Sequence, residues 1–254
     1  RTAEARSARL HQLASFRAGQ EAPFASDARC WGRACAMPSL VAPPTRPPVI
    51  EQLIEGVDRY NPDNCELLEN YLQHQCASRE HDLMANLAIL KLYQFNPELI
   101  NITVISNILA KALTAIPQPD FGTCLFMLND TLMAEEPIGK LVAMRDLLET
   151  ARYRDFWKFL SSDGVAAKAV AEVTGFENAI REARAVSMTC QSIRRRRLEE
   201  YINLSGAGFD TFLSEQGWKL EGDLVQIPIN KDNEAKTTVL SENIKFERYS
   251  ASNI

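Results

Sequence analysis

The stretch that decides the fold class is LMANLAILKLYQFNP, residues Leu83–Pro97. Leu83, Leu87 and Leu90 recur at helical spacing, and the aliphatic and aromatic residues between them widen the apolar stripe. A helix this apolar must be covered by neighbours on at least two sides. The stretch ends in Asn96-Pro97, which we interpret as the N-cap and the first residue of a following helix. The pattern therefore predicts stacked helices joined by short corners.

The same corner occurs upstream at Asn61-Pro62, and apolar stripes at helical spacing continue from residue 49 to about residue 172. We predict a helix N-cap at Asp120 and a first-turn proline at Pro137. One aromatic cluster is expected in the core rather than in a ligand site. Its members are Tyr153, Phe156, Trp157 and Leu160. Residues 49–172 thus read as an α-solenoid-like bundle.

Composition excludes several classes of protein. The 254 residues are 46% hydrophobic, enough to bury the core of one large domain or two small ones. The net charge of -5 and the pI near 5.4 provide no general basic field for nucleic acid. No apolar run reaches the roughly 18 residues that a membrane span needs. The six cysteines form no CxxC pair, so we expect reduced thiols and a cytoplasmic protein.

Residues 1–48 differ from the rest, because they contain arginines but no lysine and end in the proline cluster Pro43–Pro48. We interpret them as a disordered or non-native tail followed by a linker. An organelle transit peptide is the alternative, and the acids Glu4, Glu21 and Asp27 argue against it. Our hypothesis is that Met37, the first methionine, is the true start and that residues 1–36 are a translated leader.

The region from residue 173 to residue 254 begins with a long helical stretch that four arginines interrupt, Arg194–Arg197. Consecutive helical residues are about 100° apart, so the four side chains nearly encircle a helix. A helix-to-helix corner, or arginine stems lying on apolar surface, would resolve this. Glu199 and Glu200 follow at the spacing for ion pairs, which favours a locally neutralised surface. The alternative is contact with phosphate or with an acidic partner.

The last part of the chain changes to the period of a strand. Gly217 suits the end of a helix, and Trp218 begins a strand-like segment. Between Leu224 and Ile229 the apolar residues alternate, and Pro228 in this run predicts an edge strand. A second strand is expected at Thr237–Leu240, before a frayed end. Helices followed by a small antiparallel sheet are typical of a winged helix.

The sequence predicts no catalytic, metal or cofactor site. It lacks a GxxxxGK[ST] loop, and Gly206-Ala207-Gly208 is an isolated GxG that follows a helix. The histidines are His11, His74 and His81, and none has zinc-ligand spacing with a cysteine. We therefore expect a protein that is not an enzyme and that takes no small-molecule substrate.

Several segments resemble the subunit K family of eukaryotic translation initiation factor three, in family order from about residue 50 to residue 246. The longest is LAILKLYQFNP, residues 87–97, and the shorter ones corroborate it. They are Gly56–Pro62, Pro119–Phe121, Asp146–Thr150, Phe156-Trp157, Thr174–Glu177 and Gly217-Trp218. The N-terminal tail, the four arginines and residues 205–212 depart from the family pattern. The resemblance implies a mainly α chain: a HEAT-like helical-repeat domain over 49–172, then a winged-helix (PCI-type) domain over 173–254.

The resemblance also implies a non-catalytic scaffold subunit whose most direct partner is the L subunit and which reaches the 40S ribosomal subunit through the complex. Winged helices of related assemblies pair through their sheets, by strand addition at an open edge. This assigns partner binding to the predicted strand, namely to Trp218, Leu224, Val225, Gln226 and Ile227. The rival hypothesis is a ribosomal-RNA-binding module that uses the winged helix and Arg194, Arg195, Arg196 and Arg197.

Overall fold

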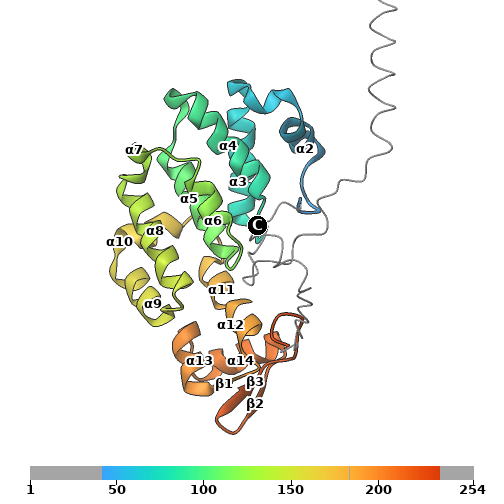
Figure 1. Cartoon of the computed structure of the whole chain (residues 1–254), viewed down its shortest axis with the longest axis vertical. Coiled ribbons are helices and arrows are strands. Elements are labelled where there is room, and N and C mark those ends of the chain that lie inside the picture. Colours follow the sequence, from blue (N-terminus) through green and yellow to red (C-terminus); the bar gives the residue numbers. More distant parts are fainter. Residues whose placement is uncertain (1–41, 183, 235–254) are drawn as a thin grey trace, which may run out of the picture. The chain divides into compact units, whose positions relative to one another are not determined.

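The computed structural model of the chain describes residues 42–182 and 184–234, which belong to one compact unit. The fold is mainly α with one small antiparallel sheet, as the sequence predicts (Figure 1). The predictions for residues 1–41, for a start at Met37, and for a strand at Thr237–Leu240 and a frayed end lie outside the described residues.

Nine α-helices and three short 3-10 turns make up the described chain as far as residue 170. They are α2 (Pro48–Glu55), η1 (Val57–Tyr60), η2 (Pro62–Asn64), α3 (Cys65–Ala77), α4 (Leu83–Phe95), η3 (Pro97–Leu99), α5 (Ile102–Thr114), α6 (Asp120–Leu125), α7 (Asp130–Met133), α8 (Glu136–Glu149), α9 (Tyr153–Ser162) and α10 (Gly164–Val170). The helices α11 (Phe176–Arg181) and α12 (Arg184–Thr189) then lead into the C-terminal region.

The apolar stretch Leu83–Phe95 forms α4, and its neighbours cover it as predicted. Leu83, Ile89 and Leu92 are almost fully buried. Helices α2, α3, α5 and α6 all contact α4, and α3, α4 and α5 lie side by side in Figure 1. The core that they share extends through the aromatic cluster of α9 and ends at Ile180. The domain boundary between residues 172 and 173 remains a prediction.

The corners between the helices differ from the sequence prediction. Asn61 accepts a hydrogen bond from the Asp63 amide, but it caps the 3-10 turn η2 rather than an α-helix. Asn96 likewise precedes a 3-10 turn, and Asn101 caps α5. The N-cap predicted at Asp120 is wrong, because Asp120 is the first residue of α6 and its buried carboxylate contacts His81. At Asp120 a tertiary contact thus takes the place of the predicted capping role.

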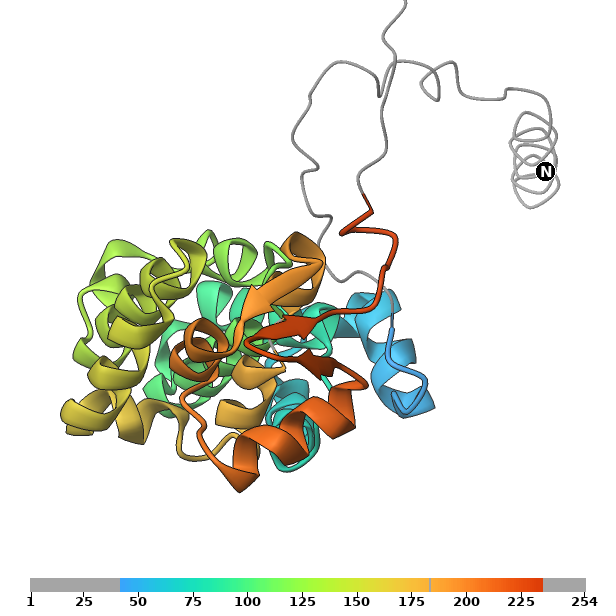
Figure 2. The same ribbon diagram turned by 90° about the horizontal axis from the view of Figure 1, so that it is seen from below.

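The C-terminal region begins with a strand that the sequence analysis missed. Its elements are β1 (Ser192–Arg194), α13 (Arg195–Ile202), α14 (Ala207–Gln216), β2 (Lys219–Glu221) and β3 (Leu224–Gln226). The strands form an antiparallel sheet in the order β1-β3-β2 and lie together in Figure 2. Ile193, expected on a helix, pairs with Val225. Helices followed by a hairpin are the outline expected of a winged helix.

The C-terminal region has its own apolar core, which Tyr201 links to the helical core. Trp157 of α9 donates a hydrogen bond from Nε1 to the Tyr201 carbonyl oxygen at 2.7 Å. Arg181 of α11 donates from Nε to the Ile202 carbonyl oxygen at 3.1 Å. Two side chains of the helical part thus hold the end of α13, where the last carbonyls of a helix lack internal partners.

Candidate interaction site

The strand predicted at the edge of the sheet lies at its centre. Residues Leu224–Gln226 pair with β1 on one side and with β2 on the other. The inference from Pro228 is therefore wrong, since this proline follows the strand instead of interrupting an edge. Ile229, expected to point inward with Val225, is 72% exposed because the alternation ends with the strand. Within the described residues the outer strands are β1 and β2.

Most of the side chains predicted to bind a partner fill the core of the C-terminal region. Trp218, Val225 and Ile227 are buried, and the Trp218 ring packs edge-on against Phe212. Gln226 is half-buried, and Leu224 is exposed. The side chains of the buried three are thus occupied by packing, and Leu224, at 42%, is the most exposed of the five. Their assignment to partner binding stays a prediction.

The hydrogen bonds of the sheet show which backbone groups face outward from it. Ile227 donates its amide to the Gln191 carbonyl at 2.9 Å, and Arg195 donates its amide to the Asp223 carbonyl at 2.8 Å. Residues 223, 225 and 227 therefore bond toward β1, and Leu224 and Gln226 bond toward β2, because antiparallel ladders alternate. Leu220, opposite Val225, consequently points its N–H and C=O away from the sheet.

The turn between β2 and β3 sets this register. Two residues, Gly222 and Asp223, connect the strands, and Gly222 has a φ of 63°. A left-handed residue at the first of two loop positions is typical of the tight hairpin turns that match strand twist, and it favours glycine. All three residues of β2 are exposed. The hairpin thus presents an outer edge with an open backbone and with the mixed charges of Lys219 and Glu221.

The four arginines occupy a strand-to-helix junction instead of a corner between helices. Arg194 ends β1, and the others form the first turn of α13. The ion pairs predicted at helical spacing are present: Arg195 Nε lies 2.9 Å from Glu199, and Arg196 Nε lies 3.6 Å from Glu200. The hydrogen bond to Glu199 raises the pKa of Arg195. The acids of α13 therefore neutralise part of this positive charge.

Three neighbouring side chains also contact this group, and one of them, Arg154, adds a positive charge. Arg154 of α9 also pairs with Glu200 and lowers the pKa of that carboxyl group. Arg195 lies over the Phe209 ring, and Arg197 lies over the Tyr201 ring at 5.8 Å from its centre. Two of the four guanidinium groups therefore lie over aromatic rings, and the explanation that arginine stems cover apolar surface stays a prediction.

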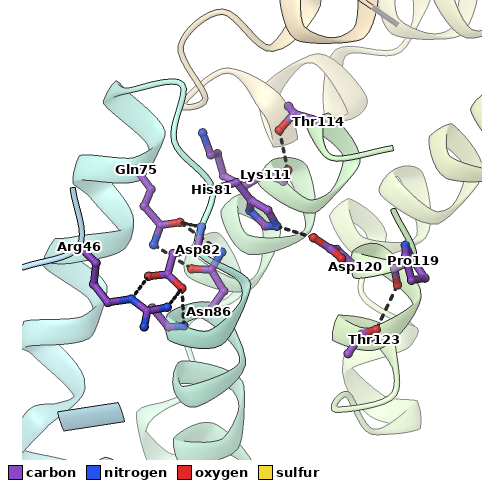
Figure 3. Close-up of polar contacts among 11 residues, drawn as sticks. Arg46, Gln75, His81, Asp82, Asn86, Lys111, Thr114, Pro119, Asp120 and Thr123 are labelled. Atoms are coloured by element: carbon purple, nitrogen blue, oxygen red, sulfur yellow. Dashed lines mark hydrogen bonds and ion pairs between the residues drawn. The ribbon is translucent and has the colours of Figure 1, made fainter. Parts of the chain in front are cut away.

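A buried polar cluster that the sequence analysis missed holds the start of α4 (Figure 3). Arg46 donates from its guanidinium to both carboxylate oxygens of Asp82, at 2.6 and 2.7 Å. The Tyr71 hydroxyl and the Ala85 amide donate to the same carboxylate. Gln75 accepts a hydrogen bond from the Asp82 amide at 2.8 Å. The only sequence signal was an aspartate directly before an apolar run, the usual place for an N-cap.

Two further buried polar contacts lie in the helical part. Lys111 is 2% exposed and donates from Nζ to the Ser78 carbonyl at 3.1 Å, and burial lowers its pKa. His81 Nε2 lies 3.0 Å from an Asp120 carboxylate oxygen (Figure 3). No group of three His, Cys, Asp or Glu residues suited to a metal ion occurs in the described residues. We therefore assign a structural role to these groups.

The described cysteines are free thiols, and most are inert. Burial raises the pKa of Cys76 to about 11 and the pKa values of Cys65 and Cys124 to about 12. Thiolates are the reactive form, so these three side chains behave as small apolar residues. Among the described helices, none combines the length and the apolar character of a membrane span.

Comparison with known proteins identifies relatives over most of the chain. The model of the CSN8/PSMD8/EIF3K family matches residues 99–239. "Eukaryotic translation initiation factor 3 subunit K" of Phaeosphaeria nodorum is 42% identical over 225 residues, which cover 81% of this chain and 92% of the relative. The proteins of the same name from Botryotinia fuckeliana and Mycosarcoma maydis are each 38% identical, covering 82% of this chain and 92% and 91% of the relatives.

Proposed function

Because this chain belongs to the CSN8/PSMD8/EIF3K family, and within it to the subunit K proteins of eukaryotic translation initiation factor 3, we propose that it is a non-catalytic scaffold subunit of that factor. Its task is protein–protein assembly on the 40S ribosomal subunit in the cytoplasm. The L subunit is its most direct partner, and it needs neither a cofactor nor a small-molecule substrate.

The observation that carries this proposal is the open edge of β2. An outer strand with free backbone donors and acceptors can bind a strand of a second protein, with the backbone supplying affinity and alternate side chains supplying selectivity. Lys219, Leu220 and Glu221 are exposed, and Leu220 directs its backbone outward. The outer side of β1 is the second candidate edge. Because all three residues of β2 are exposed and β3 is paired on both sides, we expect the partner strand beside β2 and not beside β3.

A proline at Leu220 tests the edge with little cost to the fold. Leu220→Pro removes an amide that faces away from the sheet, so the ladder to β3 keeps its hydrogen bonds. Loss of one hydrogen bond together with the steric block weakens binding to purified L subunit by about tenfold or more, since tenfold corresponds to about 1.4 kcal/mol. Leu220→Ala is the matched control, because it shortens the same side chain and keeps the amide.

Binding of these variants to purified L subunit distinguishes the two candidate edges, β2 and β1. Equal loss in Leu220→Pro and Leu220→Ala would assign binding to the side chain instead of the backbone. No loss in Leu220→Pro, combined with loss in Ser192→Pro, would move the partner to β1, because Ser192 also directs its backbone away from β3. Circular dichroism of each variant checks that the helices remain folded.

The rival function is direct binding of ribosomal RNA through the arginines. It is favoured by Arg196, whose side chain is 90% exposed. The neutralisation of Arg195 by Glu199 and the acidic balance of the chain count against it. If the substitution of all four arginines, Arg194–Arg197, by alanine abolishes RNA binding by the isolated protein, with a steep dependence on salt, the rival function is correct.

A further inference from the structure

A second candidate interaction surface lies in the helical part of the fold, away from the sheet. It is formed by η1, α4 and the residues after α6. It is a groove of about 200 Å³ whose apolar lining includes Met84, Leu87 and Met127. Arg59, Tyr60 and Lys91 form its polar margin. The volume is below the range of about 300–1,000 Å³ that is usual for small-molecule sites, so it suits an inserted side chain.

Arg59, on this margin, has one buried N–H donor without a hydrogen-bond partner. Arg59 places its guanidinium 4.8 Å from the centre of the Tyr60 ring, and its Nε atom is buried with no hydrogen-bond partner. An unsatisfied buried donor costs about 1–3 kcal/mol, more when the group is charged. A carboxylate is the natural acceptor for a guanidinium, because two parallel hydrogen bonds can form. Arg59 is partly exposed on the groove, so its terminal N–H groups can donate to an acidic group there.

A second cation lies on the same margin. Lys91 of α4 lies 4.9 Å from the centre of the Phe95 ring and donates to the Gln94 side chain at 2.8 Å. Neither Arg59 nor Lys91 takes part in an ion pair within residues 42–182 and 184–234. The groove therefore combines an apolar floor with two positive charges that form no ion pair with an acid of the described residues.

Large apolar side chains extend this surface beyond the groove itself. Phe95 is 58% exposed and packs edge-on against Tyr60, with ring centres 6.0 Å apart. Phe126, next to Met127 in the chain, is 90% exposed. Exposed aromatic residues around a methionine-lined groove are typical of a surface that binds a partner helix, because methionine adapts to the side chain that it meets.

The charge of the groove margin indicates whether a terminal segment of this chain or a segment of another protein binds there. Residues 1–41 contain six arginines and three acids, and residues 235–254 contain three basic residues and two acids. Both segments are net positive, so the cationic margin repels them. We propose that the groove binds an acidic amphipathic helix of another protein, with an apolar side chain on Met84, Leu87 and Met127 and a carboxylate on Arg59. This surface is separate from the sheet edge, and its binding does not depend on the role of β2.

Site-specific photo-cross-linking in the cells that make the protein tests the proposal. Phe95 is replaced by p-benzoyl-phenylalanine in the full chain, since this position at the margin already holds an exposed aromatic ring. The expected adduct joins Phe95 to a segment of a different protein that carries Asp and Glu between Leu, Phe or Met residues at helical spacing. Mass spectrometry of the cross-linked peptide identifies that segment.

Charge reversal provides the matched comparison. Arg59→Glu and Lys91→Glu each reduce the adduct at least about tenfold, a change of about 1.4 kcal/mol in binding. Lys158→Glu, an exposed lysine of α9 outside the groove, leaves it unchanged. If circular dichroism shows that Arg59→Glu is unfolded, Lys91→Glu decides. The proposal is overturned if the adduct joins Phe95 to this chain's own ends, to a second copy or to nucleic acid, or if no adduct forms. It is also overturned if the cross-linked segment contains no acids, or if charge reversal does not change the amount of adduct.

Discussion

Arg46 provides the sharpest test of how the helical core is held together, because it lies in a segment that its prolines mark as a linker. Its guanidinium donates to both carboxylate oxygens of Asp82, and the two side chains are only 8% and 1% exposed. Arg46→Ala leaves the Asp82 carboxylate buried without its cation. We expect this single change to destabilise the whole helical part.

The expected magnitude follows from the contacts that remain. Breaking a buried ion pair by removing one partner costs about 3–5 kcal/mol. The Tyr71 hydroxyl, at 3.2 Å, and the Ala85 amide, at 3.1 Å, still donate to Asp82 in the variant. We therefore expect the lower end, about 3 kcal/mol. Arg46→Lys keeps the charge but loses the paired geometry, so its cost lies between zero and that of Arg46→Ala.

Equilibrium unfolding of the full chain in urea, followed by circular dichroism, measures these costs. The control is Arg152→Ala, because Arg152 and Asp155 pair at 2.8 Å with side chains 61% and 43% exposed. Exposed pairs contribute about 0–1 kcal/mol. If Arg46→Ala and Arg152→Ala lower the free energy of unfolding equally, the buried pair does not stabilise the fold and the reasoning is refuted.

Three further predictions test other parts of the fold. Trp157→Phe removes the hydrogen bond to the Tyr201 carbonyl and lowers the free energy of unfolding by about 1–2 kcal/mol, measured in urea; an unchanged value would mean that water replaces the bond. Gly217→Ala places a side chain at a φ of 68° and costs about 1 kcal/mol in the same assay, and a gain in stability would contradict the strain. Cys124, whose pKa burial raises to about 12, resists iodoacetamide in the native protein at about pH 8.5, where an ordinary thiol is half ionised. Partly exposed Cys190 is alkylated before Cys124, and mass spectrometry that found Cys124 modified as fast would contradict its burial.

The helical core could be predicted from sequence because its signal is local. Leu83, Leu87 and Leu90 define the apolar stripe of α4 within three turns, and the neighbouring helices show the same period. The pairing of Arg195 with Glu199 is likewise a local consequence of helical spacing. Such features need no knowledge of the tertiary structure.

The sheet order and the buried charges could not be predicted, because both depend on distant residues. The strand β1 has three residues and becomes a strand only by pairing with β3, which follows it by about thirty positions in the chain. Without β1, Leu224–Gln226 looks like the outer member of a hairpin. Arg46 and Asp82 are 36 positions apart, and neither has a local pattern that indicates the pair. Their contact exists only in the folded core.

The central claim is that the outer edge of β2 receives a partner strand, and amide hydrogen exchange at Leu220 tests it most directly. In the free protein this amide points away from the sheet and exchanges rapidly. In the assembled initiation factor we predict strong protection of the Leu220 amide, because a partner carbonyl accepts its hydrogen bond. Exchange at Leu220 that is equally rapid in the free protein and in the complex would contradict the account.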